Sequence, residues 1–151
     1  MKTLIRFSIL TALFSFAFHS MSAEFTVEKT KDGVTVKYGE KLFTRYVVGQ
    51  SNKPFMWPII GPNGNEVTRA FPMKKREGER HDHPHHRSLW FGHQGIGGFD
   101  TWHEPASGRK TNLGSTVHRE FVKAQGGDTA VIVTRNDYVG GGKKLLADER
   151  T

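Results

Sequence analysis

Glycine and proline divide the sequence into short runs in which apolar and polar residues alternate. Residues 25–28 and 34–38 alternate on either side of turn-forming residues 31–33, which predicts a hairpin, and residues 42–48 are rich in β-branched and aromatic side chains. Apolar residues nowhere recur at helical spacing over several turns. We therefore predict an all-β chain whose antiparallel sheets form a β-sandwich or an open barrel.

Two further strands are predicted nearer the carboxyl end, at residues 116–123 and 130–139. Residues 138–151 then indicate the end of a strand, a glycine-rich turn and a returning strand, and the sequence stops within the last of these. A last strand without a following partner leaves an open edge, so we expect the amino-terminal part of a longer protein with an incomplete sheet. The alternative is that the last strand completes the sheet by pairing backwards.

The first 23 residues have the organisation of a secretory signal peptide. Lys2 and Arg6 form a positive start, residues 7–18 are an apolar run, and small residues follow up to Ala23. The apolar run is shorter than the ~20 residues that a membrane-spanning helix needs, which argues against an uncleaved anchor. We predict cleavage after Ala23, export to the periplasm or cell exterior, and a β-rich domain at 24–151 without a membrane span.

Charge and cysteine content exclude several classes of protein. The chain has 22 Lys and Arg against 15 Asp and Glu, a net charge of +7, and losing Lys2 and Arg6 with the signal peptide would leave +5. The basic residues are scattered and an exported protein seldom meets nucleic acid, so we expect a glycan or another small molecule as partner instead. The absence of cysteine excludes disulfides and thiolate metal sites.

Histidine is concentrated in one segment, because six of the eight histidines lie within residues 81–103. An extended backbone would project His81, His83 and His85 from one face. Neutral imidazoles on one face suit a divalent ion such as Zn, Fe, Ni, Cu or Mn, so these three residues are the predicted metal ligands. Pro84 removes an amide donor and restricts the residue before it to extended conformations, which places the segment at an edge or in a loop.

The same segment also fits a site without a metal. His86 and His93 would act as acid and base near neutral pH, with the glycine-rich turn around His93 letting it approach the other histidines. Arg87 offers a planar donor fork for a carboxylate or a hydroxyl pair of a substrate, and Asp100 would fix the tautomer of an imidazole. These four residues are the predicted catalytic set.

Aromatic residues near the histidines suggest where a sugar ring could bind. Trp102 and His103 are predicted to bind substrate, because an aromatic face suits the C–H side of a sugar while polar groups bond its hydroxyls. Trp90 and Phe91 fit core packing better, since they belong to a strand-like run. The remaining alternative for the histidine segment is a surface loop whose imidazoles are solvated.

Residues 83–93, with the sequence His-Pro-His-His-Arg-Ser-Leu-Trp-Phe-Gly-His, resemble a family of secreted bacterial proteins labelled "methane oxygenase PmoA-like", a domain of unknown function. Gly98, Phe99, Asp100 and Trp102 extend the resemblance, which departs from the family at Thr101, where an aromatic residue is usual. The resemblance implies a longer protein and a carbohydrate-related role. It does not imply methane oxidation, because a membrane methane monooxygenase subunit needs several apolar spans.

Three functions remain open from the sequence. The first is an exported enzyme, a hydrolase or a lyase, that acts on a saccharide through its histidines and arginine, since no pair of carboxylates typical of a retaining glycosidase is evident. The second is a glycan-binding or cell-envelope module without catalysis. The third is an oxidative metalloenzyme with a redox-active metal at His81, His83 and His85.

Overall fold

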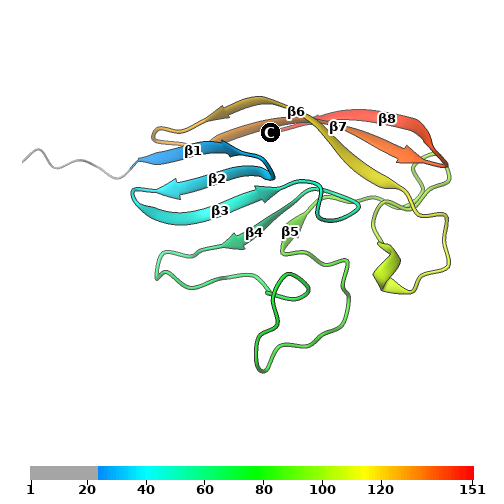
Figure 1. The fold of residues 1–151 in the computed structure, drawn as a ribbon, viewed down its shortest axis with the longest axis horizontal. Helices are drawn as coiled ribbons and strands as arrows, with labels where there is room; N and C mark the ends of the chain where they lie inside the picture. The colour runs from blue at the N-terminus through cyan, green and yellow to red at the C-terminus, as the bar shows by residue number, and fades with distance from the viewer. Residues whose placement is uncertain (1–23) are drawn as a thin grey trace, which may run out of the picture.

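The structure is a computed structural model that describes residues 24–151 (Figure 1). The predicted signal peptide at residues 1–23 lies outside the described residues. Apart from one short 3-10 helix, η1 (Pro105–Ser107), the regular elements of the described chain are β-strands in two antiparallel sheets. The all-β prediction is therefore confirmed.

The first sheet has five strands that neighbour one another in sequence order: β1 (Phe25–Thr30), β2 (Gly33–Tyr38), β3 (Lys41–Val47), β4 (Phe55–Ile59) and β5 (Leu89–Trp90). The predicted hairpin is present, because β1 and β2 pair antiparallel. Its turn requires glycine: Gly33 has a φ of 137°, and a Cβ there would lie 1.8 Å from the backbone oxygen of Tyr46.

The second sheet contains the three remaining strands: β6 (Ser115–Gln125), β7 (Val131–Gly140) and β8 (Lys143–Arg150). The strands β6 and β7 confirm the two that were predicted in this part of the chain. The strand β8 returns antiparallel along β7, from Lys143 opposite Gly140 to Arg150 opposite Thr134. The strand, turn and returning strand predicted for residues 138–151 are therefore present.

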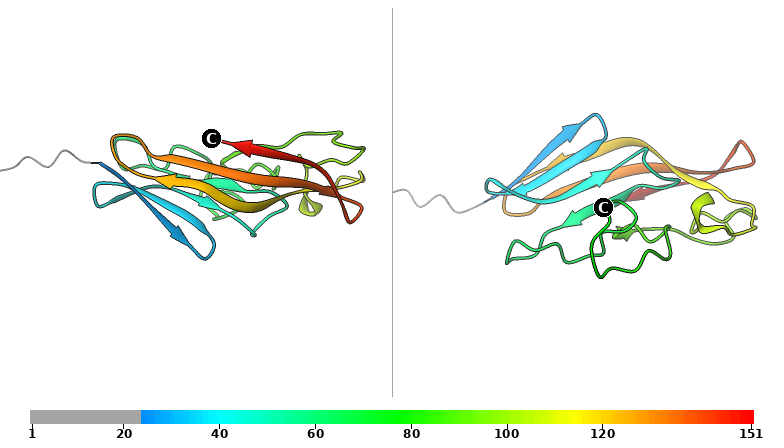
Figure 2. Two further views of the ribbon diagram at one scale, coloured as in Figure 1. Left: turned by 90° about the horizontal axis from the view of Figure 1, so that it is seen from above. Right: turned by 60° about the horizontal axis from the view of Figure 1, so that its bottom comes forward.

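The two sheets pack against each other as a β-sandwich, and they form no closed barrel within residues 24–151 (Figure 2). Reciprocal backbone hydrogen bonds of 2.8 Å between Phe25 and Gly127 tie the edges of the sheets together. A further bond of 2.7 Å runs from the Thr116 amide to the Asn52 carbonyl. The apolar core takes its most buried side chains from both sheets, among them Val34, Val36, Phe55 and Tyr138.

Two long connections carry most of the predicted site residues. One runs from β4 to β5 over residues 60–88, and the other runs from β5 to β6 over residues 91–114 (Figure 1). The strand β5 is only two residues long, so the strand-like pattern of 88–92 is shorter in the structure than in the sequence. Within residues 24–151 there is no helix of the length and apolar character needed to cross a membrane.

Candidate functional site

Four imidazole rings from the two long connections come together in space. His83, His85 and His86 belong to the β4–β5 connection, and His103 belongs to the β5–β6 connection. The ring centroid of His85 lies 4.4 Å from that of His86 and 4.5 Å from that of His103, and the ring of His83 stacks on that of His86 at 4.9 Å. We refer to these four residues as the histidine group.

A tight turn brings the first three of these histidines together. His83 has a φ of 48°, and its carbonyl accepts a hydrogen bond of 2.9 Å from the His86 amide. The extended conformation expected before Pro84 is therefore wrong, because the left-handed residue folds the chain back on itself. His81 consequently leaves the predicted face, and its ring stacks on Phe71 at 4.9 Å.

Hydrogen bonds to the carboxylate of Asp100 hold His103 in place. One carboxylate oxygen, Oδ1, accepts the backbone N–H groups of Trp102 and His103 at 2.9 and 3.0 Å. The other oxygen, Oδ2, lies 2.7 Å from Nδ1 of the His103 ring. Burial by itself would raise the pKa of Asp100, but the hydrogen bonds from His103 and Trp102 outweigh it and lower the pKa. An ionised Asp100 fixes the proton of His103 on Nδ1 and leaves Nε2 as an acceptor.

The two central imidazoles are uncharged at neutral pH. His85 is 5% exposed, and burial, assisted by His86 and His103, lowers its pKa from 6.5 to about 4. Its Nδ1 is buried and makes no hydrogen bond to any group of residues 24–151. Burial and the neighbouring His83 also lower the pKa of His86, which is half-buried. Neutral rings with free nitrogen lone pairs can accept a proton or bind a metal.

A buried ion pair lies beside the histidine group. The Arg87 guanidinium donates from Nε and Nη2 to the two carboxylate oxygens of Glu104, both at 3.1 Å, in a bidentate pair. Ser51 Oγ donates to the same carboxylate at 2.8 Å, and the Glu104 residue is 3% exposed. The Arg87 fork predicted to hold a substrate is thus largely occupied by a side chain of the protein itself.

The β3–β4 connection, residues 48–54, also supports the site, and sequence reasoning missed it. Lys53 is 1% exposed, and its Nζ donates to the Trp102 carbonyl at 2.7 Å and to Asn52 Oδ1 at 3.0 Å. Burial lowers the pKa of Lys53 to about 8, although Glu104 partly opposes the shift. Asn52 in turn donates to the His103 carbonyl at 2.6 Å. The only sequence signal for these residues is a polar run directly before a strand, which is common in loops.

Other predicted residues lie at the margin of the histidine group. Trp102 packs edge-on against Trp90 with ring centroids 4.4 Å apart, and its ring lies 6.2 Å from that of His86. His93 is exposed, and its Nδ1 lies 2.5 Å from the backbone oxygen of Gln94. In the described part of the chain, the His93 ring stacks on no other imidazole, so the turn does not bring it to the group.

The predicted metal ligands are not brought together as a set. His83 and His85 are neighbours with ring centroids 5.8 Å apart, whereas His81 packs against Phe71. Among residues 24–151, no three His, Asp or Glu side chains are arranged to hold a metal ion.

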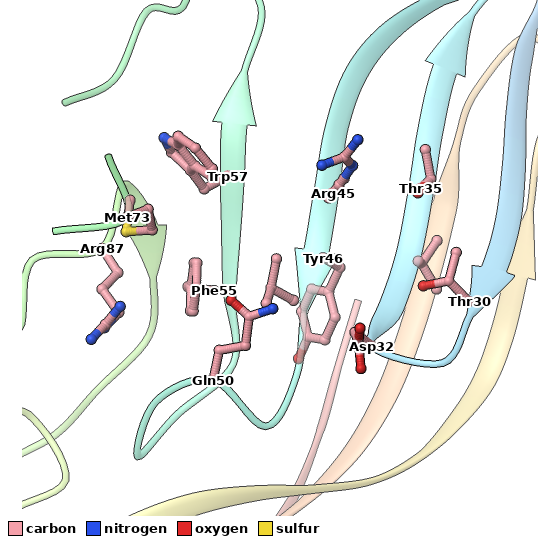
Figure 3. Close-up of a pocket in the computed structure, with 12 residues that line it drawn as sticks. Thr30, Asp32, Thr35, Arg45, Tyr46, Gln50, Phe55, Trp57, Met73 and Arg87 are labelled. Atoms are coloured by element: carbon pink, nitrogen blue, oxygen red, sulfur yellow. The ribbon is translucent and has the colours of Figure 1, made fainter. Parts of the chain in front are cut away.

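A polar hollow opens on the first sheet next to the ion pair, with a volume of about 430 Å3 (Figure 3). It is lined by Thr30, Asp32, Val34, Thr35, Arg45, Tyr46, Val47, Gln50, Phe55, Trp57, Met73 and Arg87. We call this space the sheet hollow. Arg87 is the residue that joins it to the histidine group, because this side chain lines the hollow and follows His86 in sequence.

Residues 33–151 match a family model described as "Family of unknown function (DUF6807)". The chain belongs to this family. The match to the DUF6807 family covers both long connections and hence the whole histidine group. No curated protein and no solved structure gives a significant match to the chain.

Proposed function

We propose that the protein is an exported enzyme, a hydrolase or a lyase, that acts on a saccharide by acid/base chemistry at the histidine group. The observation that carries this proposal is the group of four imidazoles backed by the buried Asp100. A positioned imidazole that is neutral at pH 7 is suited to take a proton from a hydroxyl or from water.

His86 is the residue proposed to meet the substrate. It is half-buried at the accessible side of the group, whereas His85 and His103 are buried behind it. The lowered pKa of His86 keeps its ring able to accept a proton. A positive charge that forms on His86 would be stabilised by the carboxylate of Asp82, which opposes the lowering of the His86 pKa.

The test is turnover of a panel of oligosaccharides by the protein and by His86→Ala. General acid/base catalysis typically contributes about 10²- to 10⁴-fold, so we expect a rate loss of that size. Circular dichroism should show an unchanged fold, since His86 is half-buried and makes no side-chain hydrogen bond within the described residues. His81→Ala is the matched control, because this exposed histidine lies outside the group, and it should keep full activity.

Metal analysis by plasma mass spectrometry separates an acid/base site from a metal-assisted one. The acid/base proposal predicts no stoichiometric metal in the purified protein. Near-stoichiometric metal that is lost in a His83→Ala, His85→Ala double variant would instead make the histidine group a metal site. The assays would then turn to metal-assisted hydrolysis or oxidation.

A non-catalytic glycan-binding module is the second candidate function. It is favoured by the lining of the sheet hollow, which includes Arg87 but none of the four histidines. A module of this kind would bind saccharides with equal affinity before and after the His86→Ala change, and long incubation would release no product.

We infer that the DUF6807 match and the PmoA-like resemblance describe one group of proteins. Residues 83–93, which carry the resemblance, lie inside the matched range 33–151. Membership of one family does not imply methane chemistry, and we propose none for this protein.

A further inference from the structure

We propose that the sheet hollow is a binding subsite for a neutral sugar unit of the substrate. This inference rests on the proposed function for the identity of the ligand as a saccharide. It goes further by placing the ligand over β2, β3 and β4 and by selecting a neutral ring over a charged one. The volume of the sheet hollow, about 430 Å3, falls within the range of about 300–1,000 Å3 that small-molecule pockets occupy.

The lining of the hollow combines apolar surface with both hydrogen-bond donors and acceptors. Phe55 and Trp57 contribute aromatic rings, and Gln50 contributes an amide. Figure 3 shows Arg45 and Arg87 on opposite sides of the hollow, with Phe55 between them. A sugar ring needs this combination, because its C–H face packs on aromatic surface while its hydroxyls both donate and accept.

The charges of the hollow are balanced, which is the reason for preferring a neutral ligand. Arg87 is already neutralised by Glu104. Arg45 and Asp32 are exposed residues of opposite charge, and within residues 24–151 they form no ion pair with each other or with any other side chain. A hydroxyl can accept from the Arg45 guanidinium and donate to the Asp32 carboxylate, so a diol uses both groups.

An anionic sugar fits the same lining less well. Its carboxylate would gain from Arg45 but would meet the like charge of Asp32 in the same hollow. Like charges in one site oppose each other, whereas a neutral ring meets no such repulsion. Binding of a neutral ring should also depend little on salt, because no net charge is neutralised when it binds.

The first experiment is titration calorimetry of the protein with neutral oligosaccharides of glucose, galactose, mannose and xylose, and with galacturonate oligosaccharides. At least one neutral series should bind more tightly than galacturonate, with an affinity that changes little between low and high salt. Absence of binding by every neutral series, or a preference for galacturonate that weakens steeply with salt, would overturn the proposal.

Two substitutions then locate the bound sugar. Arg45→Met should weaken binding of the preferred neutral oligosaccharide about tenfold or more, since it removes a hydrogen bond to a hydroxyl. Asp32→Asn should weaken it several-fold, since an amide oxygen is a weaker acceptor than a carboxylate. Arg135→Met is the matched control: this exposed arginine on β7 pairs with Glu120 and Glu149 outside the hollow, and its removal should leave affinity unchanged. Equal affinity of all three variants and the wild type would place the sugar elsewhere.

The enzymatic proposal and the subsite proposal can be tested separately. If sugars bind in the hollow but no product appears with the wild type, the subsite stands and the enzymatic proposal falls. If products appear but Arg45→Met and Asp32→Asn bind as tightly as the wild type, the enzyme stands and the subsite falls.

Discussion

Asp100 and Asp148 are both carboxylates with several hydrogen-bond partners, yet they belong to different kinds of structure. Asp148 lies on β8 and accepts from Asn136, Tyr138 and Arg150, of which Asn136 is directly opposite on β7. The β-ladder thus sets the geometry around Asp148. Asp100 lies in an irregular connection, where the hydrogen bonds of the carboxylate itself shape the loop.

Within residues 24–151 each region leaves one buried polar atom without a hydrogen bond: Nδ1 of His85 near Asp100, and Oδ1 of Asn136 near Asp148. Both oxygens of Asp148 are used by neighbours on its own sheet. The chain of contacts from Asp100 runs through His103 to His85, whose buried Nδ1 has no partner. Buried polar atoms are usually paired, so an unpaired one in a loop indicates a place where a ligand or proton completes the structure. We expect the sheet network to stabilise the fold, whereas the loop network is the place where we propose chemistry.

The largest expected effect on stability is the loss of the ion pair between Arg87 and Glu104, which lies beside the histidine group. Glu104→Ala leaves the Arg87 guanidinium without its counter-charge, and that side chain is only 17% exposed. We expect a loss of about 3 kcal/mol in the free energy of unfolding, measured by urea denaturation. Asp148→Ala should cost about 1 kcal/mol, since the side chain of Asp148 is 23% exposed whereas that of Glu104 is 4% exposed. Equal losses would remove the distinction between the two regions.

Asp100→Asn should lower the rate of turnover by about 10- to 100-fold, the usual range for a residue that positions an active group. The amide preserves the acceptor for the two backbone N–H groups, but it removes the charge and reverses the tautomer of His103. The effect should fall on kcat with KM unchanged. Asp148→Asn is the matched change in the sheet network and should leave both constants unaltered; a rise in KM for Asp100→Asn with kcat unchanged would show a role in binding instead.

The pH dependence of stability should carry the signature of His85. Its pKa is about 4 in the folded protein and near 6.5 when the chain unfolds. Between these values the unfolded state binds more protons, so the free energy of unfolding should decrease as pH falls from about 6.5 to about 4. Denaturation by urea at several pH values should show this slope reduced in His85→Gln. The exposed His81→Gln serves as control and should retain the slope; an unchanged slope in both variants would contradict the buried, neutral state of His85.

Much of the fold followed from the sequence because the strands are encoded locally. Alternation and turn residues predicted β1, β2, β3, β6 and β7. The strand β5 could not be given its length in this way, since only Leu89 and Trp90 pair with β4. Pairing of so short a segment depends on the position of its neighbour in space rather than on its own residues.

The candidate site was predicted less completely. The sequence identified the histidine segment, Arg87, Asp100 and His103, and the structure places all of these close together except His81 and His93. It could not predict the pairing of Ser51 with Glu104, because 53 positions separate the two residues. The extended conformation predicted for His83 was also wrong, since a single left-handed residue reverses the face on which the following side chains lie.

The amide of Asn52 bonds two backbone carbonyls, those of His103 and Gly114, and so ties the β3–β4 connection to both ends of one loop. His103 is therefore held by a residue that lies 51 positions earlier in the chain. A synthetic peptide covering residues 81–103 would carry most of the reactive side chains without the support that orients them. Transplanting this chemistry to another scaffold would require moving the β3–β4 connection as well.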